Sequence, residues 1–135
     1  MTMPILDQSE KVIFWIENDI LFCQFNQSDC FLTEDSAEAY LLKIEKLTAG
    51  KPMPLLIDIR NFIGNFSPIA AKFFADSLII KKFVIAQAFV INTLHSKLLI
   101  GSYKRLFAQD AHVQVFADTE TALAFCEESK RNFNV

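Results

Sequence analysis

Glycine is scarce in this sequence, which has 3 glycines and 4 prolines among 135 residues. Glycine supplies the backbone freedom that long loops and phosphate-wrapping loops need, so a glycine-rich nucleotide loop is not expected. Cysteine is also rare: Cys23, Cys30 and Cys126 form an odd set without C-x-x-C spacing. This pattern is typical of reduced thiols and not of a disulfide framework.

An excess of positive charge is missing as well. The net charge is -3 and the isoelectric point is about 5.3, so nothing attracts nucleic acid or anionic lipid to the chain as a whole, and we expect no nucleic-acid partner. Locally, residues 72–105 carry six basic side chains and one acid, Asp76. This segment forms either one basic face or an ordinary solvated face that acids from elsewhere balance.

Neither a secretory leader nor a membrane-spanning run is expected from this sequence. The first residues lack a basic region followed by an apolar one, so no secretory signal is expected. The apolar region 78–91 is interrupted by Lys81, Lys82 and Gln87, whereas a bilayer span needs about 20 mainly apolar residues. Together with the reduced thiols, this predicts a cytoplasmic protein without a membrane span.

Signals of secondary structure recur along the chain. Two β-prone runs, 12–17 and 20–25, flank Asn18 and Asp19, which tolerate the positive φ of a tight hairpin turn. Mainly apolar runs at 55–59, 83–91 and 113–116 predict further strands. Capping residues predict four helices, which begin after Thr33, Ser67, Asn92 or Thr93, and Asp118 or Thr119.

The predicted order is ββαβαβαβα. Strands that alternate with helices after an opening hairpin indicate an α/β fold, with a mixed, mostly parallel sheet of about five strands and four helices. A hydrophobic content of 52% supplies one core for a single domain over residues 1–135, with the core at about 12–131.

The most informative segment is Pro54–Asn61, which contains an apolar run that ends at Asp58. Ser67 follows Asp58 nine residues later. Pro68 follows at the first helical position, so Ser67 is expected as the N-cap of the next helix. An apolar strand, an Asp at its end and a Ser that opens the next helix resemble the STAS domain of anti-sigma-factor antagonists and sulphate transporters. Phe66 and Pro68 stand where that family usually has an acid and a small residue.

The resemblance implies a STAS-like fold over nearly the whole chain and a Ser67 that is phosphorylated in the antagonists' manner. The segment Leu55–Asn61 also resembles uncharacterised bacterial STAS-like proteins that are grouped with Sec14-type lipid-transfer folds. Ser67 either only caps its helix or carries a regulatory phosphate. Asp58 either reaches solvent at the end of its strand or pairs with Arg60, Asn61 or a helix N-terminus, or else it contacts a partner or ligand.

The segment 78–83 carries too many large apolar residues for an exposed loop. Ile79 and Ile80, with Phe73 or Phe74, are expected to form a homodimer or partner surface, unless a longer helix or an early strand buries them within the chain.

Two functions from different classes follow. The first is a non-enzymatic regulatory module that binds another protein, or a second copy of itself, through Asp58, Ser67, Ile79 and Ile80. The alternative is a carrier of a small apolar ligand or lipid, in a cavity among Phe73, Phe74, Phe83 and Phe107. No catalytic residue, cofactor site or metal site is predicted, because neither histidine lies at ligand spacing from a cysteine, histidine or acid.

Overall fold

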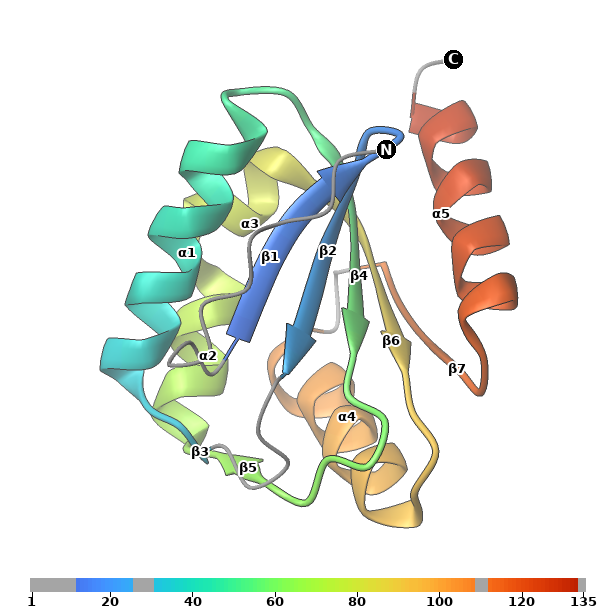
Figure 1. The fold of residues 1–135 in the computed structure, drawn as a ribbon. Helices are drawn as coiled ribbons and strands as arrows, with labels where there is room; N and C mark the ends of the chain where they lie inside the picture. Colours follow the sequence, from blue (N-terminus) through green and yellow to red (C-terminus); the bar gives the residue numbers. More distant parts are fainter. Residues whose placement is uncertain (1–11, 26–30, 109–111, 134–135) are drawn as a thin grey trace.

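The computed structural model describes residues 12–25, 31–108 and 112–133. Its centre is a five-stranded sheet in the order β1-β2-β4-β6-β7 (Figure 1). β1 and β2 are antiparallel, and every other neighbouring pair is parallel. The predicted mixed, mostly parallel α/β sheet is confirmed. Its strands are β1 (Val12–Glu17), β2 (Ile20–Phe25), β4 (Met53–Asp58), β6 (Val84–Val90) and β7 (Val113–Phe116).

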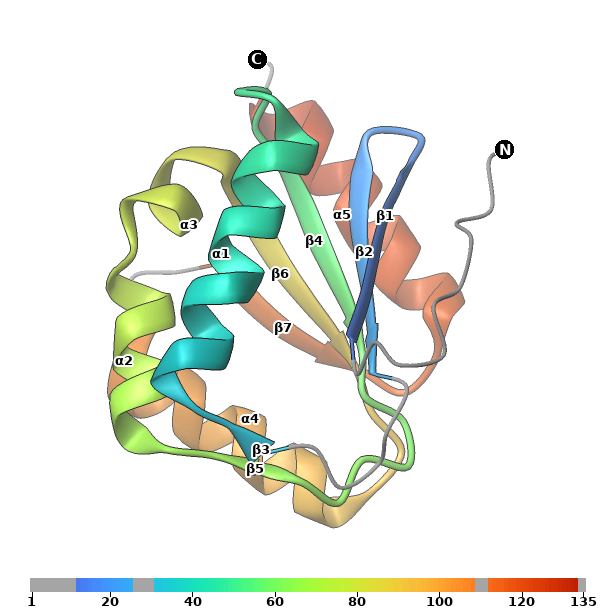
Figure 2. The same cartoon turned by 60° about the vertical axis from the view of Figure 1, so that its left-hand side comes forward.

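Helices cover the two faces of the sheet unequally. Four helices lie on one face and α5 lies on the other, as the two views in Figure 1 and Figure 2 show. None of the helices among the described residues is both long enough and apolar enough to cross a bilayer. The helices are α1 (Glu34–Thr48), α2 (Pro68–Asp76), α3 (Leu78–Phe83), α4 (Leu94–Phe107) and α5 (Thr119–Phe133).

The opening hairpin is confirmed. Asn18 and Asp19 have φ angles of 54° and 60°, which a type I′ turn requires at both central positions. Short polar side chains of this kind reach the left-handed region at lower cost than most residues. The turn sets the register, in which Glu17 faces Ile20 and Val12 faces Phe25.

Side-chain caps begin the helices at the predicted residues. The hydroxyls of Thr33, Ser67 and Thr93 accept backbone N–H groups at the starts of α1, α2 and α4. The Asp118 carboxylate accepts the Thr121 N–H at the start of α5. Each cap satisfies a donor that the first turn of a helix leaves without an intrahelical partner.

β4 is covered on both faces, as its apolar run predicts. Leu55 and Ile57 belong to the core cluster under the four helices, whereas Leu56 belongs to the cluster under α5. Successive side chains of a strand point to opposite faces, so a central strand with helices on both sides is apolar throughout.

Two features differ from the prediction. The expected helix after Ser67 is followed by a separate helix, α3, so the described residues contain five helices. Ser77 divides the two, because its backbone is extended (ψ 136°) and its hydroxyl accepts the Ile79 N–H. The strand expected from residue 83 therefore begins at Val84. A small second sheet also forms where β3 (Phe31–Leu32) pairs in parallel with β5 (Asn65–Phe66).

Candidate functional site

Ser67 lies at the junction between β5 and α2. Its Oγ accepts a hydrogen bond from the Ala70 N–H at 3.0 Å, and its own N–H donates to the carbonyl of Leu32 at 3.0 Å. Pro68 occupies the first turn of α2, where its missing N–H costs no hydrogen bond. The Ser67 side chain is half-buried, so its hydroxyl is held by its helix and still reaches the molecular surface.

Exposed apolar side chains flank Ser67. On α2, Ile69 is 66% exposed and Phe73 is 37% exposed. Phe31, 54% exposed, precedes the residue whose carbonyl binds the Ser67 N–H. We call Ser67, Phe31, Ile69 and Phe73 the Ser67 surface. Its combination of an accessible hydroxyl, a helix N-terminus and apolar contact area suits the binding of another molecule.

Asp58, at the end of β4, is paired with Arg60. The guanidinium donates to both carboxylate oxygens, with Nε–Oδ1 at 3.0 Å and Nη2–Oδ2 at 2.8 Å, and the Arg60 N–H donates to Oδ1 at 3.1 Å. Burial alone raises the pKa of Asp58, but the hydrogen bonds and positive charge of Arg60 outweigh it and hold the pKa below its usual value. Of the two expected roles, the structure therefore shows the pairing.

The first turn of α4 holds the loop between β4 and β5. The Asn61 N–H donates to the Asn92 side chain at 2.6 Å, and the Asn92 amide donates back to Asn61 at 2.9 Å. His95 Nε2 lies 2.7 Å from the Gly64 carbonyl, and the Ser96 hydroxyl donates to the Phe62 carbonyl at 3.3 Å. This loop leads from Asp58 to β5, and Ser67 follows β5, so α4 and the residues just before it hold most of the backbone between the two candidates.

These hydrogen bonds between the loop and the start of α4 were not predicted, although the sequence contains a pattern that could have indicated them. Asn61 and Asn92 each follow an apolar strand and lie at the carboxyl ends of β4 and β6, which are adjacent parallel strands. Such ends meet at one edge of a sheet. There Gln24, Asp58 and Arg60 line, with the two asparagines, a polar depression of about 290 Å³.

Asp58 and Ser67 do not form a joint reactive pair. Asp58 binds Arg60, whereas the Ser67 hydroxyl binds the backbone of its own helix. Burial raises the pKa of the Cys126 thiol to about 12, so this thiol stays protonated at neutral pH. Within the described ranges, no three side chains of His, Cys, Asp and Glu gather as a metal site requires. Cys30 lies outside those ranges.

The apolar surface predicted around Ile79 and Ile80 is arranged differently. Ile80 is 4% exposed and packs into the core under the four helices, and Ile79 is half-buried against the same core. Among the large apolar residues of α3, Leu78 is the exposed one, at 66%. The separate helix α3 turns the two isoleucines inward, so Ile80 is not available to a partner.

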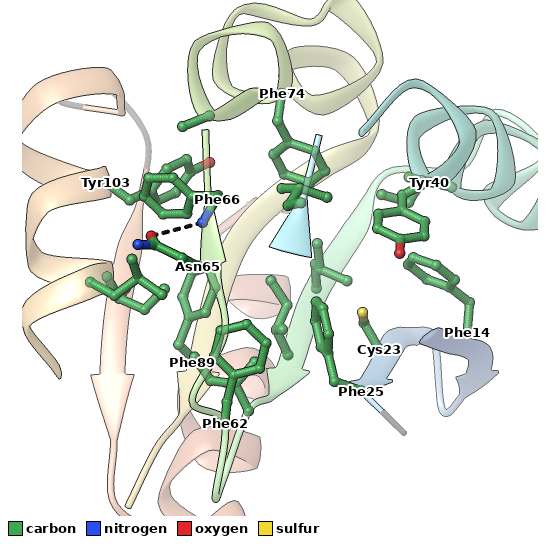
Figure 3. A pocket seen from close by; sticks show the side chains of 18 residues that line it. Phe14, Cys23, Phe25, Tyr40, Phe62, Asn65, Phe66, Phe74, Phe89 and Tyr103 are labelled. Carbon is green, nitrogen blue, oxygen red and sulfur yellow. Dashed lines mark hydrogen bonds between the residues drawn. The ribbon is translucent and has the colours of Figure 1, made fainter. Parts of the chain in front are cut away.

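A cavity of about 100 Å³ lies between the sheet and the helices α1, α2 and α4 (Figure 3). Its lining is almost entirely apolar, and eight of the 18 lining residues are aromatic. Of the four phenylalanines expected to line a cavity, Phe74 lines this one and Phe107 lines a separate pocket of about 490 Å³, whereas Phe73 faces solvent on the outer side of α2. The principal aromatic residues of the lining are Phe25, Phe62, Phe66, Phe74, Phe89 and Tyr103.

Tyr103 joins the cavity to a buried polar pair. Its hydroxyl donates to Gln87 Oε1 at 3.2 Å, and both residues are at least 95% buried. Burial raises the pKa of Tyr103 to about 12, so the hydroxyl remains a neutral donor over the physiological range. The Gln87 side chain thereby keeps a partner inside the core.

Two solved structures share this fold. A protein of the DUF3478 family with a SpoIIAA-like fold, from Shewanella loihica PV-4, is similar with a TM-score of 0.58 and 20% identity over 85% of this chain and 91% of that one. An anti-sigma factor antagonist from Mycobacterium paratuberculosis is similar with a TM-score of 0.55 and 12% identity over 90% and 97%. These likenesses confirm the STAS-like fold.

No curated protein matches the chain. One family model does, and it spans most of the sequence, from the middle of β1 to the last turn of α5. Because that model matches residues 14–130, the chain belongs to the family described as a domain of unknown function, DUF7793.

Proposed function

We propose that this chain is a regulatory module that binds another protein through the Ser67 surface, and that phosphorylation of Ser67 controls the binding. The observation that carries the proposal is the position of the Ser67 hydroxyl, at the N-terminus of the helix that carries the exposed side chains Ile69 and Phe73. The likeness of the fold to an anti-sigma factor antagonist supports it.

A phosphate at Ser67 changes this surface strongly. It adds a charge of about -1.5 to -2, and the unpaired N–H groups and positive end of α2 stabilise that charge. The same charge lies beside the apolar contact area of Ile69 and Phe73, where a partner would have to desolvate it. The unmodified module therefore binds its partner and the phosphorylated module releases it.

Affinity capture of the tagged protein from its own host tests the proposal. Ser67→Asp is expected to lose a stoichiometric partner that the wild type and Ser67→Ala retain, and tandem mass spectrometry is expected to find phosphate on Ser67. Ser77→Asp is the matched control, because Ser77 is also a serine that caps a helix in the same layer. Equal capture by Ser67→Asp and wild type would contradict the proposal.

The cavity supports a second candidate, the binding of a small apolar ligand. An engineered apolar cavity of about 150 Å³ holds benzene, whereas sites for larger ligands measure about 300–1,000 Å³. At about 100 Å³, the cavity suits a molecule of benzene size or smaller and is too small for a lipid chain. Native mass spectrometry with added benzene tests it, and a protein that takes up no benzene would reject this candidate.

A further inference from the structure

The outward face of α4 carries a regular stripe. Ser96, Ile100 and Tyr103 are buried and so define its inner side. On the opposite side, Leu94, Leu98, Gly101 and Arg105 follow one another at the 4-3-4 spacing by which helices pack against helices. Leu94 is 70% exposed and Leu98 is 62% exposed, so the apolar part of this stripe is unpartnered within the described residues.

Gly101 makes a notch in the stripe. A Cβ placed on Gly101 would meet nothing within 4 Å, so the space above this residue is open. A side chain from another helix can occupy this space and contact the neighbouring turn of α4. The stripe is therefore uneven, and its shape is more complementary to the side chains of a helix than to a flat partner surface.

The charge around the stripe has one sign. Lys97 and Lys104 are exposed beside it, and α4 contains no acid. The sequence contains no Asp or Glu at all from residue 77 to 109, although the whole chain has a net charge of -3. A partner that covers Leu94 and Leu98 must therefore bring negative charge to lie opposite the two lysines.

We propose that the α4 stripe docks an acidic amphipathic helix of another protein. Leucine or isoleucine side chains of that helix pack on Leu94 and Leu98 and enter the notch at Gly101, while its flanking acids pair with Lys97 and Lys104. This docking surface is separate from the Ser67 surface, so the inference does not depend on the proposed function.

A second copy of this chain fits less well. Two α4 helices packed together would bring Lys97 and Lys104 of both copies into one interface, where like charges repel. The acidic helix α1 has an exposed leucine, Leu42, so packing of α1 of one copy on α4 of the next is the self-association that light scattering must exclude.

An anionic membrane also fits less well. An interfacial helix presents a broad apolar face to the lipid. The outward stripe of α4 offers two leucines, a notch and Arg105. Of the other apolar side chains of α4, Leu106 is 61% exposed, and the rest pack in or against the core.

Fluorescence anisotropy tests the proposal with a labelled synthetic peptide of three heptads that carries Leu at a and d and Glu at e and g. The peptide is kept at nanomolar concentration, so that it stays monomeric, and the protein is titrated. We expect saturable binding that weakens with salt. Leu98→Asp and the double variant Lys97→Glu/Lys104→Glu should each weaken it about tenfold or more. Leu42→Asp on α1 is the matched control and should leave it unchanged.

Three results would overturn the proposal. The first is absence of binding, or equal affinity of the peptide for Leu98→Asp and Leu42→Asp. The second is co-sedimentation with phosphatidylserine vesicles that Leu98→Asp abolishes while the peptide does not bind, which would assign the stripe to a membrane. The third is a wild-type dimer in light scattering that Leu98→Asp converts to a monomer. Because Leu98 is exposed, its variant should keep the wild-type melting curve, which circular dichroism checks.

Discussion

The two faces of the sheet are packed in different ways. Under α5, three fully buried small residues, Ala88, Ala122 and Cys126, pack beside Ile20, Leu56 and Val90. Under the four helices, the core contains Phe62, Phe89 and many other aromatic residues and includes the cavity. Small residues let a helix approach a sheet closely, whereas large rings from several elements fill space less evenly.

One strand shows how the sequence makes this difference. In β6, Ala88 and Val90 point to α5, whereas Gln87 and Phe89 point to the four helices. The alternation places small residues on one side of the strand and large ones on the other. The faces accordingly differ in role: the α5 face supplies close packing, and the opposite face supplies the cavity and carries both proposed docking surfaces.

The largest expected effect comes from adding volume to each face. Ala122→Leu forces extra atoms into the close packing under α5 and should lower the free energy of unfolding by about 3 kcal/mol. Ala71→Leu makes the same change at an equally buried residue that lines the cavity, so it should change that free energy by less than about 1 kcal/mol. Urea unfolding measures both. Equal losses would show that the two faces are packed alike.

An intermediate effect is expected from the buried polar pair of the helix-covered face. Tyr103→Phe removes the donor to Gln87 Oε1 and leaves that oxygen buried without its partner, which should cost about 2 kcal/mol. The double variant Tyr103→Phe/Gln87→Leu removes both polar groups and should recover part of the loss. Thermal unfolding measures the loss of stability in each variant. A double variant whose loss exceeds the sum of the losses of the two single variants would contradict this account.

The smallest effects concern the helix caps on the two sides. Ser67→Ala should cost about 1 kcal/mol, and this cost should be the same at pH 7 and pH 3, because a hydroxyl cap does not titrate. The cap of α5 is a carboxylate. Hydrogen bonds from the Thr121 N–H and hydroxyl hold the pKa of Asp118 below its usual value.

The lowered pKa of Asp118 sets the direction in which stability changes with pH. The ionised carboxylate contributes fully to the free energy of unfolding above the unfolded-state pKa of about 3.9, and this contribution is lost as the pH falls through the lower pKa of the folded state. Asp118→Asn should therefore be less stable than the wild type at pH 7, and the gap should narrow below about pH 4. Urea unfolding across this range measures it, and a constant gap would exclude the ionised cap as its source.

The features that the sequence predicts depend on few neighbouring residues. A few adjacent residues determine the turn at Asn18 and Asp19 and the helix start at Ser67 and Pro68. The apolar run of β4 likewise predicts that helices cover both faces of this strand. The helix α3 that starts after Ser77 was missed, because the segment after Ser77 was interpreted as a connection between a helix and a strand. Ile80 was consequently expected on the surface.

The remaining features depend on contacts between distant parts of the chain. β3 and β5 have two residues each, which is too short for any periodic pattern. The cavity is lined by side chains from the sheet, three helices and a loop, so no single segment encodes it. For the candidate site, the sequence predicts the cap at Ser67 but not the exposed neighbours Phe31 and Ile69, because exposure is set by packing elsewhere.

The two buried cysteines give the most direct test of the difference between the faces. Cys23 lines the cavity, whereas Cys126 is fully buried under α5. In a Cys30→Ser background, small methyl methanethiosulfonate should modify Cys23 in the folded protein and reach Cys126 only at the rate of global unfolding, as read by peptide mass spectrometry. Modification of Cys126 as fast as Cys23 would contradict the account, because the α5 face would then be no less penetrable than the face that holds the cavity.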